Sequence, residues 1–209
     1  MANRNRMIAA GFCLLFAGVR QLAAQGNTAD VFVGYSFTKT NPLPDLSGQS
    51  SLPKLNTNGW TFAPNGYLRP WFGVGAEITG SYGTNTPPAS IGAPGFATHE
   101  YSYLFGPQFR FVDNQRWRVG FRFLLGGAHG KVALPLSIQN SQILPAANAG
   151  YVPFSETKFA ASWSVPVDVT ITKTLGWRIE PTLYLTDFHI QKQSWFRFAT
   201  GPVFRFGGK

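Results

Sequence analysis

Hydrophobic and polar residues alternate with a period of two along most of the chain from Val31 onward. One clear case is the stretch from Trp195 to Phe206, where one set of alternate positions is almost all apolar and the other is small or charged. Its apolar face carries Phe196, Phe198, Pro202, Phe204 and Phe206, and its other face carries Arg197, Ala199, Gly201 and Arg205. A period of two predicts a β-strand with two unlike faces.

Seven further stretches show the same alternation, with aromatic and β-branched residues on one face and glycine, serine, threonine and single charges on the other. They begin near Val31, Trp60, Phe72, Glu100, Trp117, Phe159 and Trp177. We therefore predict eight strands of about ten residues, the length that a tilted strand needs to cross a membrane. Because proline cannot donate a ladder hydrogen bond, we expect bulges or displaced strand ends at five prolines within these strands. They are Pro64, Pro107, Pro166, Pro181 and Pro202.

The connections between these strands alternate between long and short. The long ones are Thr40–Asn56, Gly83–Thr98 and Lys131–Phe154, the short ones are Arg69–Pro70, Asp113–Gln115 and Lys173–Gly176, and His189–Ser194 is of moderate length. In outer-membrane barrels, short turns lie on the periplasmic side and long loops lie outside. Trp71, Trp117 and Trp177 each adjoin a short turn, which is typical of an aromatic girdle at the inner interface. The pattern predicts an all-β, eight-stranded antiparallel up-and-down barrel that spans the bacterial outer membrane, with lipid against its aromatic face.

The composition favours the same interpretation. Charged residues are only 13% of the chain, whereas a soluble surface normally carries about 25–35%. Lys and Arg outnumber Asp and Glu by 18 to 9, but the arginines are scattered singly, so we predict no nucleic-acid partner. A soluble lipocalin-like barrel is the alternative, and it would need Lys and Glu on its outer face.

The N-terminus has the three parts of a secretory signal peptide. Arg4 and Arg6 precede the apolar run 7–19, and the small residues Ala23 and Ala24 follow it. We predict a signal peptide over residues 1–24 and a barrel domain over residues 25–209. The single cysteine, Cys13, lies in the apolar run, so the mature chain is expected to contain no disulfide.

Ten charged residues fall on the polar faces of the predicted strands or at the start of one. They are Glu77, Glu100, Arg110, Arg118, Arg122, Asp168, Arg178, Glu180, Arg197 and Arg205. The carboxylates among them are candidates for catalysis, but we favour a salt-bridged polar core. Unpaired buried charge is costly, and an eight-stranded barrel is just wide enough for side chains to fill it.

No motif in the sequence indicates a cofactor or a metal. The three histidines, His99, His129 and His189, share no metal-ligand spacing. Glycine-rich phosphate loops, nucleophile elbows and zinc motifs do not occur.

The chain resembles the small outer-membrane β-barrel proteins related to the OmpA-type transmembrane domain. The resemblance is carried by residues 34–37 (GYSF), 71–77 (WFGVGAE), 103–111 and 200–207 (TGPVFRFG). It implies the same fold and a location in the outer membrane. It also implies a C-terminal assembly signal at Gly201, Phe204 and Phe206, read by the barrel assembly machinery. The sequence departs from that signal at Ala199 and in the extension 207–209.

Three functional classes stay open, and the prediction is a structural, adhesive or surface-interaction role rather than an enzyme. The expected partners are outer-membrane lipid and a surface ligand bound through the long loops, one of which carries apolar residues such as Leu134, Tyr151 and Phe154. A narrow channel is the second class. The third is a lipid-modifying enzyme, for which His189 and Ser194 form the nearest pair. The sequence does not determine the oligomeric state.

Overall fold

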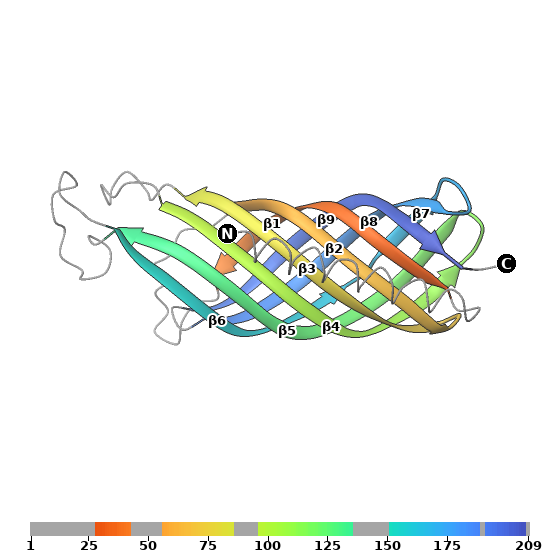
Figure 1. The fold of residues 1–209 in the computed structure, drawn as a ribbon, viewed down its shortest axis with the longest axis horizontal. Coiled ribbons are helices and arrows are strands. Elements are labelled where there is room, and N and C mark those ends of the chain that lie inside the picture. Colours follow the sequence, from red (N-terminus) through yellow and green to blue (C-terminus); the bar gives the residue numbers. More distant parts are fainter. Residues whose placement is uncertain (1–27, 43–55, 86–95, 136–150, 189–190, 208–209) are drawn as a thin grey trace, which may run out of the picture.

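The computed structural model describes residues 28–42, 56–85, 96–135, 151–188 and 191–207 (Figure 1). These residues form nine antiparallel strands, β1 (Ala29–Pro42), β2 (Asn56–Arg69), β3 (Phe72–Asn85), β4 (Phe96–Asp113), β5 (Trp117–Pro135), β6 (Tyr151–Ser164), β7 (Val167–Thr170), β8 (Leu175–Phe188) and β9 (Gln191–Phe206). Within the described segments, no helix is long and apolar enough to cross a membrane.

Each strand pairs with its neighbour in sequence, except that β6 and β7 both pair with β5 and with β8, and β1 also pairs with β9. The sheet therefore closes on itself and leaves no free edge, as Figure 1 shows. Closure matters physically because every strand then has a partner on both sides for its backbone hydrogen bonds. The eight-stranded antiparallel barrel predicted from the alternation is confirmed.

β6 and β7 are two segments of one strand of this barrel. Ser164 pairs with Thr182 on β8, and Val167 pairs with Ile179 on β8. The two pairs are three residues apart on both sides of this ladder, so no residue is inserted between β6 and β7. The same holds against β5, where Arg122 pairs with Ser164 and Val119 pairs with Val167. The break lies at Pro166, which has no N–H to donate to the ladder. The barrel thus has eight strands although it has nine segments.

The prediction of a bulge or a displaced strand end is confirmed at Pro166 but is wrong for the other four prolines. Each of them keeps its pairing with one neighbouring strand, as Pro64 does with Val31 and Pro107 with Val74. Pro181 and Pro202 pair with Phe198 and Trp177. A residue in an antiparallel sheet points its N–H toward one neighbour only, so a proline interrupts one ladder and leaves the register intact. The register shifts lie instead near turns, at 67/69 and 110/112.

The strands are longer than predicted, with 14 to 19 residues in all of them except the divided one. The expected loop over residues 131–154 is wrong at both ends, because β5 continues to Pro135 and β6 begins at Tyr151. The moderate connection predicted for residues 189–194 is likewise reduced to residues 189–190. Pairing extends past the apolar stretch of each strand because the partner strand still satisfies the backbone there.

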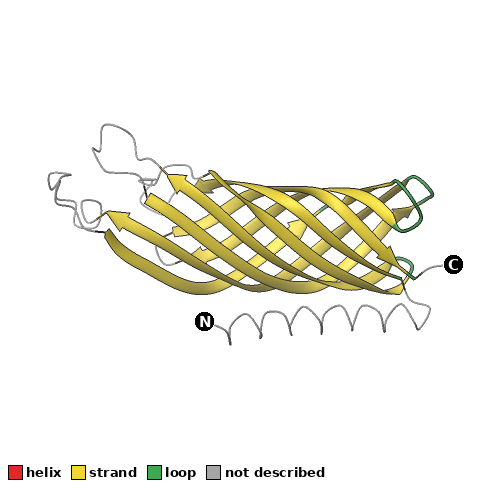
Figure 2. Cartoon of the chain, turned by 45° about the horizontal axis from the view of Figure 1, so that its top comes forward, coloured by secondary structure: helices red, strands yellow, loops and turns green. Residues whose placement is uncertain are grey.

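The strand ends that are joined by short turns and those that lead to the long connections lie at opposite ends of the barrel (Figure 2). Residues 70–71, 114–116 and 171–174 make the turns at one end, which we call the turn end. The strands that lead to 43–55, 86–95, 136–150 and 189–190 finish at the other end, which we call the loop end. The predicted signal peptide and most of the predicted loops lie outside the described residues.

Alternate side chains face the interior and the outer wall, as the period of two requires. On the outer wall are aromatic side chains such as Phe105 and Phe111, each 71% exposed. The inner positions of the same strand, including Ser102, Gln108 and Arg110, are buried. Charge therefore lies inside this barrel and aromatic surface lies outside, the reverse of a soluble lipocalin-like barrel.

Candidate functional site

Among the described residues, the interior holds equal numbers of buried acidic and basic side chains. Ten such residues are buried, and they are Asp30, Glu77, Glu100, Asp168, Glu180, Arg110, Arg122, Arg178, Arg197 and Arg205. Five carboxylates thus face five guanidinium groups, so their formal charges cancel. Such balance is required where water cannot screen or solvate an isolated charge.

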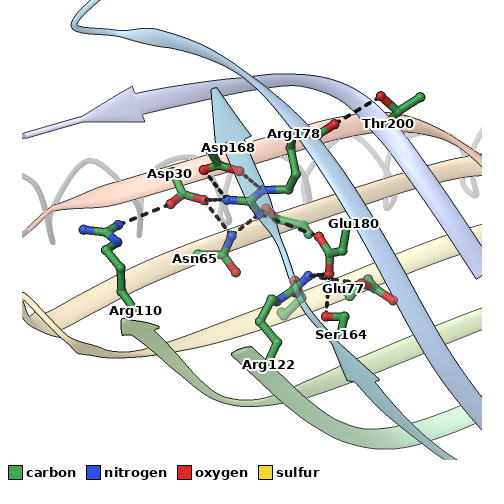
Figure 3. Close-up of polar contacts among 12 residues, drawn as sticks. Asp30, Asn65, Glu77, Arg110, Arg122, Ser164, Asp168, Arg178, Glu180 and Thr200 are labelled. Carbon is green, nitrogen blue, oxygen red and sulfur yellow. Dashed lines mark hydrogen bonds and ion pairs between the residues drawn. The ribbon is translucent and has the colours of Figure 1, made fainter. Parts of the chain in front are cut away.

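Arg122 of β5 organises the middle of the interior (Figure 3). Its Nη1 donates to Glu180 Oε1 at 2.6 Å and to Glu77 Oε2 at 3.3 Å. Ser164 donates to the same Glu180 oxygen at 2.6 Å, and Arg197 Nη2 donates to Glu77 Oε1. We call Glu77, Arg122, Ser164, Glu180 and Arg197 the central cluster. Because its members come from β3, β5, β6, β8 and β9, the cluster ties opposite walls of the barrel together.

Arg178 of β8 organises a second group nearer the turn end (Figure 3). Its Nε donates to Asp168 Oδ1 at 2.6 Å and its Nη2 to Asp168 Oδ2 at 3.0 Å, a bidentate pair. The same Nη2 donates to Asp30 Oδ1 at 3.3 Å, and Asn65 donates to that oxygen at 2.7 Å. A longer contact of 3.9 Å between Arg178 Nη1 and Glu180 Oε2 joins this group to the central cluster.

Arg110, Arg118 and Arg205 complete this second group at the turn end. Arg110 Nη1 and Arg118 Nε both donate to Asp113, at 2.8 and 2.7 Å. Arg205 Nη1 donates to Thr170 Oγ1 at 2.9 Å, and its Nη2 lies 3.9 Å from Asp168 Oδ2. We call Asp30, Asn65, Arg110, Arg118, Asp113, Asp168, Arg178 and Arg205 the turn-side cluster.

The sequence analysis did not identify Asp30, Asp113 or Tyr67 as members of the network. Asp30 bridges Arg178 and Arg110, and the Arg110 guanidinium lies 3.7 Å above the Tyr67 ring. Asp30 was identifiable in principle, because it occupies the same alternate positions as Phe32, one residue before the predicted strand began. The contacts of Asp113 and Tyr67 depend on the spacing between strands, which periodicity does not supply.

Glu100 is the one predicted network residue that the described contacts place in neither cluster. It is buried on β4, four residues nearer the loop end than Leu104. Between these positions and the central cluster lies an apolar layer, Leu104, Leu124, Ala128, Ala160, Tyr184 and Trp195. Arg197 meets this layer with its guanidinium 5.5 Å from the Tyr184 ring. The interior therefore contains an apolar group beyond the central cluster, with buried polar side chains such as Glu100, Thr98 and Thr38 nearer the loop end.

Inward glycines leave space that neighbouring side chains fill. A methyl group at Gly75 would collide with the Asn65 side chain and lie 3.4 Å from Gln108 Oε1. The cavity beside Tyr67, Gln108, Arg110, Arg122 and Arg178 measures about 10 Å³, roughly the space for one water molecule. Around this cavity, the interior is thus filled by side chains.

The two histidines that the structure describes, His99 and His129, do not form a common site. His99 packs against the Tyr82 ring, and His129 bonds Thr157 Oγ1 through Nδ1 at 2.8 Å on the outer wall. Ser155 lies 3.4 Å from His129 Nε2, and both hydroxyl residues belong to the adjacent strand β6. His189 lies outside the described residues. Among the residues that the structure describes, no three His, Cys, Asp or Glu side chains form a group that could hold a metal ion.

The residues of the predicted assembly signal lie where β9 closes the barrel against β1. Phe206 pairs with Ala29 and packs against Ala29, Val31 and Phe62. Phe204 is exposed on the outer wall. A methyl group at Gly201 would lie 2.7 Å from Gly34 Cα, so the close approach of the two strands requires glycine there. The role of these residues in assembly stays a prediction.

Comparison with known proteins supports the fold. No protein-family model matches the chain, and no curated protein matches it in sequence. The crystal structure of Ail, the attachment invasion locus protein of Yersinia pestis, in complex with the heparin analogue sucrose octasulfate, is similar with a TM-score of 0.54 and 15% identity, covering 86% of this chain and 99% of Ail. The crystal structure of Neisserial surface protein A is similar with a TM-score of 0.60 and 10% identity, covering 88% of this chain and 97% of that protein. Both are eight-stranded outer-membrane barrels, and at these identities the likeness establishes the shared fold.

Proposed function

We propose that this chain is an integral protein of the bacterial outer membrane, with a non-enzymatic role in structure, adhesion or surface interaction carried out through its loop end. One observation supports the membrane location most directly, and it is that the closed barrel presents aromatic side chains outward and buries its charges inside. In water, such an outer wall would expose far more contiguous apolar surface than a soluble monomer carries. In a bilayer the same wall is solvated by lipid.

The extent of the apolar wall supports this location. On β3, the outward positions from Phe72 to Ile78 are apolar, and Trp71 and Tyr82 flank them. About ten residues separate these two aromatics, which is the number that a tilted strand needs to cross the hydrocarbon core. Trp and Tyr are the residues that prefer the two membrane interfaces.

Two features support surface interaction rather than transport. Side chains fill the described interior, and the longest connections all leave the same end of the barrel. In outer-membrane barrels that end lies outside the cell. The likeness to Ail, which was solved with a heparin analogue, and to a surface protein supports the same proposal.

Membrane fractionation and epitope labelling test the proposal. We expect the protein in the outer-membrane fraction, with a gel mobility that changes on boiling because the folded barrel resists detergent at room temperature. Tags inserted after Pro88 or Asn140 should be labelled on intact cells, whereas a tag at Asn114 should be labelled only after permeabilisation. Recovery in the soluble fraction would contradict the membrane location, and reversed labelling would contradict the orientation.

A further inference from the structure

The three short turns share a feature that the proposed function does not use. In each turn a basic residue is followed, one to four positions later, by a tryptophan at the start of the next strand or just before it. The pairs are Arg69 with Trp71, Arg116 with Trp117, and Lys173 with Trp177. All six side chains are exposed, and the tryptophans are exposed by 56%, 43% and 45%. We call these six residues the turn ring.

The three cations of the turn ring have no acidic partner in the described part of the chain. Within residues 69–71, 113–117 and 171–177, which include the turns and the turn ring, Asp113 is the one acidic residue, and Arg110 and Arg118 already bond it. No ion pair within the described residues involves Arg69, Arg116 or Lys173. The turn end therefore presents three uncompensated positive charges, whereas the charges inside the barrel are balanced.

The tryptophans fix the depth of these charges relative to a bilayer. Trp71 stacks on Phe109 with 6.5 Å between ring centroids, and Trp177 donates from Nε1 to Thr200 Oγ1 at 2.9 Å. Both rings thus lie against the outer wall, at the end of its apolar surface. Because tryptophan prefers the interface and long basic side chains extend toward water, each cation lies at the level of the lipid headgroups.

We propose that the turn ring binds the headgroups of anionic phospholipids in the leaflet that surrounds the turn end. The inference rests on the proposed membrane location. Arginine offers a phosphate two parallel N–H donors, and lysine offers a point charge. A zwitterionic headgroup brings its own positive charge beside its phosphate, so an uncompensated cation favours an anionic headgroup. Each basic residue near an anionic membrane surface contributes a preference of about fivefold.

The tryptophans of the turn ring also serve as the reporters for the test. The barrel is reconstituted in bilayers that contain brominated phosphatidylglycerol or brominated phosphatidylcholine, each of which quenches nearby tryptophan fluorescence. The variant Trp60→Phe/Trp163→Phe serves as background, because it leaves tryptophan on the outer wall only in the turn ring. We expect stronger quenching by the anionic lipid than by the zwitterionic lipid at equal mole fraction.

Two variants in that background decide the outcome. Arg69→Gln/Arg116→Gln/Lys173→Gln should lose the preference for the anionic lipid, about fivefold for each contact removed. Lys39→Gln/Lys131→Gln/Lys158→Gln removes the same charge at the loop end and should retain the preference. Equal quenching by the two lipids, or loss of the preference in both variants, would overturn the inference while leaving the membrane location intact. A protein that does not enter the bilayers, with no mobility change on boiling, would instead contradict the proposed function.

Discussion

Arg122 is the single side chain on which the interior depends most. It is 1% exposed, it bonds two carboxylates from opposite sides of the barrel, and both of those carboxylates are equally buried. Removing two charges from water is costly, and only the paired arrangement offsets that cost. Neutralising Arg122 therefore leaves the interior with one excess buried negative charge, because Arg197 and Arg178 then face both Glu77 and Glu180 without it.

We expect Arg122→Met to lower the free energy of unfolding by about 3–5 kcal/mol, because Glu77 and Glu180 would then repel each other without a cation between them. Glu180→Gln should have an effect of similar size. Urea unfolding in detergent micelles, followed by tryptophan fluorescence, measures both. Arg118→Met is the matched control, since Arg118 is partly exposed in its pair with Asp113 and should cost no more than about 1 kcal/mol.

The double variant Arg122→Met/Glu180→Gln tests whether the pair acts as a unit. Its loss of stability should be smaller than the sum of the two single losses, because no unpaired charge remains at that contact. Additive losses would show that the contact seen in the structure contributes no coupling, and the central cluster would then be incidental.

At this scale, the inward or outward direction of a residue was predictable and its partner was not. Glu77, Arg122 and Glu180 lie on the polar side of a period of two, so their burial follows from the sequence. That Arg122 bonds Glu180 rather than Asp168 follows from register and strand tilt, which depend on how the whole sheet closes. Asp30 was not predicted because its strand begins at Ala29, two residues before the predicted start at Val31.

Among the elements, β9 both closes the barrel against β1 and carries the predicted assembly signal. Its alternation is clear in the sequence, and its faces were predicted correctly. The ends of other strands were predicted poorly, as at Pro135 and Tyr151. The apolar pattern of a strand shows only which of its side chains contact lipid or the interior. The backbone pairing of that strand continues for as long as the partner strand supplies hydrogen bonds.

We expect Phe206→Ala to reduce the amount of folded protein in cellular membranes more than Phe196→Ala does. Both are aromatic residues on the outer face of β9, but Phe206 is the terminal residue of the predicted signal. The measurement is the fraction that resists detergent unfolding at room temperature on a gel of outer membranes. Equal yields for the two variants would remove the signal assignment.

Refolding into micelles separates assembly from stability. Phe206 also packs against Ala29, Val31 and Phe62, so its loss weakens the closure of the barrel as well. If the signal is read by the assembly machinery, the two purified variants should differ less in micelles than they do in cells. A difference of the same size in both settings would attribute the whole effect to packing.

At the scale of the whole molecule, the barrel reverses the usual distribution of polar and apolar residues and then divides its interior into layers. The turn-side and central clusters are polar, and the layer around Leu104, Leu124 and Trp195 is apolar. Fold class and strand number were predictable because alternation repeats eight times. The layering was not, because it depends on which inward residues reach the same depth from different strands.

The layered interior predicts that the barrel conducts ions poorly or not at all in planar bilayers. An ion crossing it would have to pass the apolar group around Leu104 and Trp195, and then a network in which Arg122 bonds both Glu77 and Glu180. The cavity of about 10 Å³ near Arg110 holds roughly one water molecule, which is less than a hydrated ion needs. Replacing Leu104 and Trp195 with Ala should open the apolar layer and raise the frequency of conducting events, whereas Phe105→Ala on the outer wall should not. Large, steady conductance from the unaltered monomer, insensitive to Glu77→Gln or Arg122→Gln, would show that ions bypass both layers and that the interior is open.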